Sequence, residues 1–168
     1  MLQLISFRRP ARQLLVAALG ALSLLAACQK DDEKDYTQID EGIIKQYVAD
    51  NKLTDAQRQS SGLYFVPTTT TTGVQPKRGQ TVSVKYTGYL LNGTIFDASA
   101  RHNYGAPFQF ELGKGQVIKG WDEGIGLMTK GSKAMLLVPS ALGYGSQAAG
   151  PIPANSVTRF DVELVDVQ

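Results

Sequence analysis

The fold is decided by residues 81–97, TVSVKYTGYLLNGTIFD. In the first half of this stretch, apolar Val82, Val84 and Tyr86 alternate with polar residues, which is the pattern of a strand with one buried face. The Asn-Gly pair at 92–93 tolerates positive φ and is a strong local signal for a hairpin turn. A second strand is predicted directly after this turn. The stretch therefore predicts two antiparallel neighbours within one sheet.

Similar patterns along the chain predict the rest of the sheet. Proline cannot donate to a strand ladder, so Pro67 is expected to end its strand, and the threonines at 68–72 are expected to form a loop. A short helix is predicted near residues 118–128, although three glycines weaken it. A sheet that buries one face against one short helix is typical of the α+β class. The further predicted strands are 63–66, 94–97, 107–111, 133–138 and 156–167.

An amphipathic helix is predicted at residues 38–50, before the sheet. Its apolar residues recur at helical spacing, and the segment from Thr37 to Asp40 resembles a capping box. Such a helix can pack on the domain or pair with another copy of the chain; packing is the commoner outcome. The sequence contains no internal repeat and no sign of a second domain.

Residues 1–27 have the parts of a secretory signal. Three arginines, at positions 8, 9 and 12, precede an apolar run that is too short for a permanent membrane-spanning helix. The run ends in Leu-Ala-Ala before Cys28, which resembles the lipobox of bacterial lipoproteins, so Cys28 is expected to become the lipidated N-terminus. A plain signal peptide is the alternative, but Cys28 is the only cysteine and would otherwise be a loose thiol.

Composition and charge exclude several classes of function. The chain is 43% hydrophobic and 19% charged, as in an ordinary globular protein. The formal charge of +2 becomes −1 once the three arginines of the signal are removed, so no nucleic-acid partner is expected. His102 is the only histidine, and no phosphate loop, dinucleotide fingerprint or nucleophile elbow is found. We therefore expect neither a metal nor a cofactor.

Aromatic residues fall at strand ends and beside loops. Each one alone is better explained by core packing, since aromatic side chains dominate protein cores. Together with Asp97, they could instead line an apolar cleft with a few polar groups, as small-ligand sites do. The residues concerned are Tyr86, Phe96, Phe108, Phe110, Trp121, Tyr144 and Phe160.

Several blocks, in unbroken order over residues 62–168, closely resemble the FKBP-type peptidyl-prolyl cis/trans isomerases. The blocks are VKYTGYL (84–90), NGTIFDAS (92–99), PFQF (107–110), LGKGQVIKGW (112–121), YG (144–145), IP (152–153) and FDVEL (160–164). The resemblance implies an FKBP-like fold, a twisted antiparallel sheet wrapped around a short helix, with the substrate proline entering the hollow between them.

The resemblance also implies a role for individual residues. Trp121 would form the floor of the pocket, and the backbone N–H of Ile118 and the hydroxyl of Tyr144 would bond the bound chain. The catalytic candidates, placed around the reacting peptide, are Phe96, Asp97 and Tyr144. The other substrate-binding candidates are Tyr86, Phe108, Val117, Ile118, Ile152 and Phe160.

The chain departs from the family pattern at the rim of this pocket. Gln116 stands where many members have glutamate, and the segment 100–106 is longer than in the smallest members, so no role is transferred to Arg101 or His102. The loop 146–150 is shorter, and an unexpected Pro151 follows it. These changes affect peptide preference and macrolide affinity more than activity.

The expected function is isomerisation of X-Pro bonds in exported or envelope proteins, with no cofactor and with macrolides of the FKBP class as inhibitors. The alternative is a non-catalytic module that binds Pro-containing segments. We expect a signal (1–27), a tether (28–36), a helical extension (37–61) and the isomerase domain (62–168). The lipid on Cys28 would hold the protein at the cell envelope, where the outer membrane is the expected site. The Lys-plus-acidic composition of the tether resembles an export signal for the cell surface, although a simple solvated tether would read the same.

Overall fold

The computed structural model describes residues 35–168, and these residues belong to one compact unit. It contains two α-helices, α1 (Tyr36–Asp50) and α2 (Lys119–Gly126), and three short 3-10 helices, η1 (Ser99–Arg101), η2 (Asn103–Gly105) and η3 (Ser140–Leu142). The strands are β1 (Gln57–Arg58), β2 (Tyr64–Thr69), β3 (Thr81–Leu90), β4 (Ile95–Ala98), β5 (Phe108–Glu111), β6 (Lys133–Val138) and β7 (Thr158–Val167).

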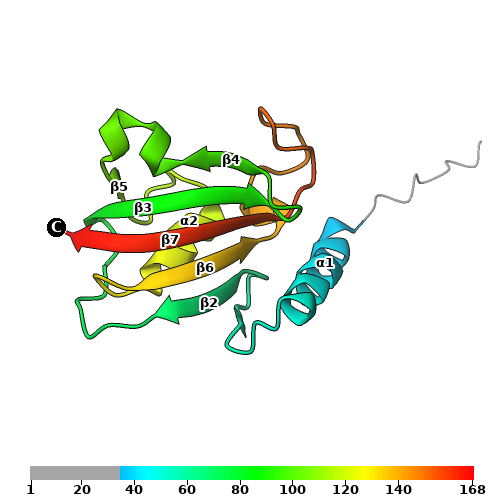
Figure 1. Cartoon of the computed structure of the whole chain (residues 1–168), viewed down its shortest axis with the longest axis horizontal. Coiled ribbons are helices and arrows are strands. Elements are labelled where there is room, and N and C mark those ends of the chain that lie inside the picture. The colour runs from blue at the N-terminus through cyan, green and yellow to red at the C-terminus, as the bar shows by residue number, and fades with distance from the viewer. Residues whose placement is uncertain (1–34) are drawn as a thin grey trace, which may run out of the picture. The chain divides into compact units, whose positions relative to one another are not determined.

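The described strands form one antiparallel sheet in the order β1-β2-β6-β7-β3-β4 (Figure 1). One edge of β3 is shared, because β5 pairs with its first half and β4 with its second half. The predicted hairpin between β3 and β4 is confirmed, and Gly93 takes the positive φ, +89°, that the turn requires. The α+β class predicted from the sequence, an antiparallel sheet with a short helix against it, is confirmed.

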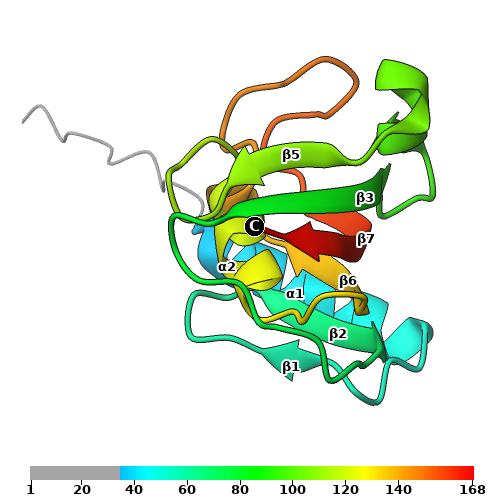
Figure 2. The same cartoon turned by 90° about the vertical axis from the view of Figure 1, so that its left-hand side faces the viewer.

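The two faces of the sheet carry different helices. Successive strand residues point to opposite faces, and Leu136 of β6 packs with Trp121 and Ile125 of α2 in the main core. Its neighbour Leu137 packs instead with Ile44 of α1, in a second and smaller core. The helices therefore pack on side chains that point to opposite faces of the sheet. Figure 2 shows α2 in front, beside the strands, with α1 behind it. Of the two outcomes open for the N-terminal helix, packing on the domain is the one observed.

The start of α1 corrects two predictions. The helix begins at Tyr36, inside the predicted tether, and its N-cap is Asp35, whose carboxylate accepts the Thr37 N–H at 3.0 Å. The capping box predicted from Thr37 to Asp40 is therefore wrong. Asp40 is buried and bonds Ser140 far along the chain, a contact that no local pattern could reveal.

Pro67 corrects a third prediction, because it lies inside β2 and does not end it. It pairs with Ala134 of β6, whereas β1 covers the other edge of β2 only at Tyr64 and Phe65. At Pro67 that outer edge is open, so the missing N–H breaks no ladder. The strand consequently continues into the threonine run, through Thr69.

Four short elements were not predicted, and one helix is shorter than expected. The two-residue strand β1 and the 3-10 helices have too few residues to show a period. The predicted helix at 118–128 is confirmed as α2, but it begins at Lys119 and ends at Gly126. Residues 1–34, which include the predicted signal and Cys28, lie outside the described part of the chain.

Candidate active site

The site lies between the sheet and the start of α2, where α2 approaches β6 very closely. A Cβ atom on Gly120 would lie 2.6 Å from Val138 Cγ1, and one on Gly124 would lie 2.8 Å from Leu136 Cδ1. Only glycine allows this contact. Two of the three glycines that weaken α2 as a helix are thus the ones that let it pack closely on the sheet and set the depth of Trp121.

A third close approach, at Gly88 of β3, brings two aromatic rings together. A Cβ atom there would lie 2.7 Å from the Phe96 ring and 2.9 Å from the Phe160 ring. These rings meet edge to face, with centroids 5.5 Å apart. Phe96 on β4 and Phe160 on β7 can therefore pack across β3, which lies between their strands.

A hollow of about 400 Å³ opens at this place. Its volume falls within the usual range for small-ligand pockets and can accept a proline ring. Seven predicted site residues line it, from β3, β4, β7, the start of α2 and the segment after η3. The lining consists of Tyr86, Asp97, Gly115, Gln116, Val117, Ile118, Trp121, Tyr144 and Phe160.

The other three predicted residues support the hollow or lie next to it. Phe96 meets the Tyr144 ring edge to face, with centroids 5.9 Å apart. Phe108 is 43% exposed and meets the edge of Trp121, but it lines a neighbouring hollow that Tyr86 also borders. Ile152 is buried and is not part of the lining.

Trp121 forms the floor of the hollow. Only 5% of it is exposed, and the rings of Tyr86 and Phe160 meet it edge to face at 4.8 and 5.3 Å. Its Nε1 is buried without a hydrogen-bond partner among residues 35–168. Both alternatives for the aromatic residues therefore hold in part: they build the core, and the same rings line a cleft.

Asp97 is the carboxylate of the site, and three groups hold it. Its Oδ2 accepts the Tyr86 hydroxyl at 2.7 Å, and its Oδ1 accepts the Ala98 N–H at 2.8 Å and lies 2.6 Å from His102 Nε2. Burial opposes ionisation, but the bonds from His102, Tyr86 and Ala98 outweigh it and lower the pKa of Asp97. The carboxylate is therefore ionised at neutral pH.

His102 is the site residue that sequence reasoning missed. It follows η1, and its side chain is 61% exposed. No motif marked it, because the length of a loop does not say where its side chains point. The one available signal was that His102 is the only histidine and lies five residues after Asp97.

Two hydrogen-bond donors of the hollow are free to meet a ligand. Within the described residues, the Tyr144 hydroxyl makes no hydrogen bond, and neither does the backbone N–H of Ile118, the N-cap of α2. Burial, and then the charge of Asp97, raises the pKa of Tyr144, so this phenol stays protonated and can donate. Burial, and then the bond to Asp97, likewise raises the pKa of Tyr86.

Neither a metal-binding cluster nor a membrane-spanning helix is found among the described residues. Residues 35–168 contain no cluster of three or more His, Cys, Asp or Glu side chains that could hold a metal ion. No helix within the same residues is long and apolar enough to cross a membrane. The groups that the hollow itself offers are the apolar floor of Trp121, the fixed carboxylate of Asp97 and the free donors of Tyr144 and Ile118.

Comparison with known proteins gives one consistent result. Residues 72–165 match the family model described as FKBP-type peptidyl-prolyl cis-trans isomerase. FK506-binding protein 2 of Dictyostelium discoideum is 50% identical over 95 residues, which cover 56% of this chain and 70% of that protein. FkpA of Aeromonas hydrophila, an FKBP-type peptidyl-prolyl cis-trans isomerase, is 44% identical over 125 residues, or 74% of this chain and 45% of that protein.

Solved structures agree with the sequence matches. FkpA from Escherichia coli has a TM-score of 0.67 at 37% identity, covering 79% of this chain and 61% of that one. AtFKBP13 has a TM-score of 0.63 at 36% identity, covering 67% of this chain and 98% of that one. Three further relatives are much longer, and this chain spans 28% or less of their length.

Proposed function

The chain belongs to the FKBP-type peptidyl-prolyl cis-trans isomerase family, and on that premise we propose that it accelerates X-Pro isomerisation in exported or envelope proteins while anchored to a membrane by a lipid. The isomerase activity is that of its family. The observation that carries the assignment to this site is the open hollow above Trp121, which Asp97, Tyr144 and the start of α2 border.

The chemistry requires only a place where the amide can twist. Rotation about a peptide bond meets a barrier of roughly 18–20 kcal/mol, because resonance makes the C–N bond partly double. To shorten a step of tens of seconds to milliseconds, about ten-thousandfold, a site must lower that barrier by about 5.5 kcal/mol. The task therefore needs no nucleophile.

We assign the lowering of the barrier to three contributions. Twisting destroys the resonance and leaves a less polar amide, which the aromatic walls of the hollow tolerate better than the planar form. The free donors on Tyr144 and Ile118 can bond the twisted chain more strongly than the planar one, and only such a difference accelerates the step. The fixed charge of Asp97 favours the twisted amide, whose carbonyl carbon has become more positive.

A peptide assay tests this assignment. The fragment 35–168 is expected to accelerate the cis/trans conversion of an X-Pro peptide in a protease-coupled assay, and Asp97→Val is expected to lower the rate while the fragment stays folded. Val74→Ala, in an exposed side chain outside the hollow, serves as a control with unchanged rate. A folded wild-type fragment with the uncatalysed rate would leave only the non-catalytic binding module.

Ligand binding by the same hollow offers a second test. Several relatives are named FK506-binding proteins, and we propose that a macrolide of this kind enters the hollow above Trp121. It should compete with the peptide substrate and quench the fluorescence of Trp121, the only tryptophan of the chain. If saturating macrolide does not quench the Trp121 fluorescence of the wild type, this part of the proposal is refuted.

The anchor is proposed from the sequence of residues 1–28. The apolar run before Cys28 and the absence of any other cysteine support lipidation of its thiol. Cys28→Ser is expected to move the protein from the membrane fraction to the soluble fraction, whereas Ser23→Ala, within the same leader, should leave it at the membrane. Recovery of the Cys28→Ser protein with the membranes would refute the anchor. Labelling of intact cells with an impermeant reagent then decides between surface and periplasm.

A further inference from the structure

A buried carboxylate links α1 to the segment that carries Tyr144. Asp40, on α1, is only 1% exposed. Its Oδ2 accepts both the backbone N–H of Ser140 at 2.8 Å and the Ser140 hydroxyl at 2.6 Å. The two residues are 100 positions apart in the sequence. Buried charges are rare in proteins unless they are paired, so this contact is an unusual one.

From Ser140 the contact continues to both neighbours of Tyr144. The Ser140 carbonyl accepts the Gly143 N–H at 3.0 Å and the Gly145 N–H at 2.9 Å. The Gly145 carbonyl in turn accepts the Asn155 N–H at 2.9 Å. The backbone on either side of Tyr144 is thus tied to Ser140, the residue that Asp40 holds. The position of the Tyr144 hydroxyl depends on that backbone.

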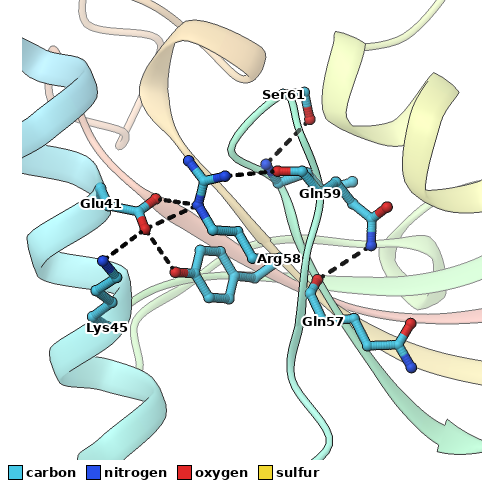
Figure 3. A network of polar contacts seen from close by, with 8 residues as sticks. Glu41, Lys45, Gln57, Arg58, Gln59 and Ser61 are labelled. Carbon is cyan, nitrogen blue, oxygen red and sulfur yellow. Dashed lines mark hydrogen bonds and ion pairs between the residues drawn. The ribbon is translucent and has the colours of Figure 1, made fainter.

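α1 has other contacts that attach it to the domain. Ile44 is buried in the second core, and the Tyr47 hydroxyl accepts a bond from Arg159 at 3.1 Å. Glu41 binds Arg58 at 2.9 Å and Lys45 at 3.1 Å, as Figure 3 shows. These contacts reach β1, β2, β6 and β7, and none involves the segment that carries Tyr144.

Asp40 is poorly suited to attachment alone. Its Oδ1 is buried without a hydrogen-bond partner among residues 35–168. A buried carboxylate with an unpaired oxygen is costly, and an apolar side chain of similar size commonly stabilises such a place better. What the carboxylate adds is direction, because it fixes one residue with two bonds, one from the backbone N–H of Ser140 and one from its hydroxyl.

We propose that Asp40 is a positioning residue for catalysis, which holds the segment Ser140–Gly145 so that the Tyr144 hydroxyl faces the substrate. The inference rests on the proposed function of the hollow. It makes the N-terminal helix part of the catalytic structure, beyond its covering of one face of the sheet. A misplacement of the order of 1 Å at a reacting group can cost about a hundredfold in rate, so a loosened Tyr144 should be measurable.

The test compares variants of two neighbouring residues on α1 in the full-length protein. Asp40→Ala is expected to lower kcat/KM about tenfold, through kcat more than KM. Asp40→Asn keeps an oxygen that can accept both Ser140 bonds, and should restore most of the rate. Glu41→Gln weakens the contacts to Arg58 and Lys45 and serves as the matched control. It should lower stability without changing kcat/KM.

Hydrogen exchange supplies a readout that needs no substrate. The amides of Gly143 and Gly145 are bonded to Ser140 and should exchange at least about tenfold faster in Asp40→Ala, while amides in β7 stay protected. This measurement remains informative even if the wild type shows no isomerase activity, so the two proposals can fail separately.

Specific outcomes would overturn the inference. Unchanged kcat/KM and unchanged exchange in Asp40→Ala would do so, as would an equal loss of rate in Glu41→Gln. If Asp40→Ala does not fold, Ser140→Ala takes its place, because it removes the 2.6 Å bond and keeps the backbone bond. It should shift both readouts in the same direction by a smaller amount, and no shift would refute the link.

Discussion

Loss of the hydroxyl should affect different properties at two tyrosines of the hollow, catalysis at Tyr144 and stability at Tyr86. The Tyr144 hydroxyl has no hydrogen-bond partner within residues 35–168, whereas the Tyr86 hydroxyl donates to Asp97 at 2.7 Å. Both rings keep their aromatic neighbours when tyrosine is replaced by phenylalanine. Tyr144→Phe should therefore change catalysis, and Tyr86→Phe should change stability.

The magnitudes follow from the bonds at stake. A hydrogen bond that Tyr144 makes to the twisted substrate is worth about 0.5–1.5 kcal/mol, so its loss should lower kcat/KM by about 2- to 12-fold. Unfolding of Tyr144→Phe should be unchanged, because no bond within the protein is lost. Tyr86→Phe loses a bond to a charged but partly exposed group, worth about 1.5 kcal/mol, or about 5 °C in Tm.

Paired measurements check this reasoning. The protease-coupled assay gives kcat/KM, and thermal unfolding followed by circular dichroism gives Tm for the same preparations. An unchanged kcat/KM in Tyr144→Phe would show that the hydroxyl does not act on the substrate. A fall in Tm equal to that of Tyr86→Phe would show that Tyr144 makes a structural bond after all, and would refute the distinction.

Two further predictions concern packing and pH. Gly120→Ala places a methyl group against β6 and should destabilise the protein by about 1–3 kcal/mol in urea unfolding. Gly42→Ala, with open space around it, should instead stabilise α1 by up to about 1 kcal/mol. Equal effects of the two substitutions would refute the close approach of α2 to β6. The pKa of Asp97 is lowered from 3.8, so the stability that its ionisation contributes is present above 3.8 and is lost as the pH falls through the lower folded-state pKa. The difference in Tm between the wild type and Asp97→Asn should therefore be constant near pH 5 and shrink as the pH falls below 3.8. His102→Ala should move this loss to higher pH, and an unmoved loss would refute the pairing.

The sequence alone predicted the elements whose signal is local. Alternation at residues 81–86 and the turn at Gly93 predict β3 and its hairpin, because the two-residue period and the turn conformation are properties of neighbouring residues. The strand at 133–138 was predicted with its observed bounds for the same reason. The family resemblance then named the residues of the hollow, seven of which line it.

The tertiary structure decided what depends on residues distant in the sequence. Asp40 resembles a capping residue, but it bonds Ser140 across the fold. Gly120 lowers helix propensity, and only the structure shows that Val138 leaves no room for a larger residue there. His102 has a role only because its loop folds back to Asp97. The periodicity of the sequence determines which face of an element a side chain is on, but not which residue it contacts there. That partner is set by how the sheet and the two helices pack as a whole.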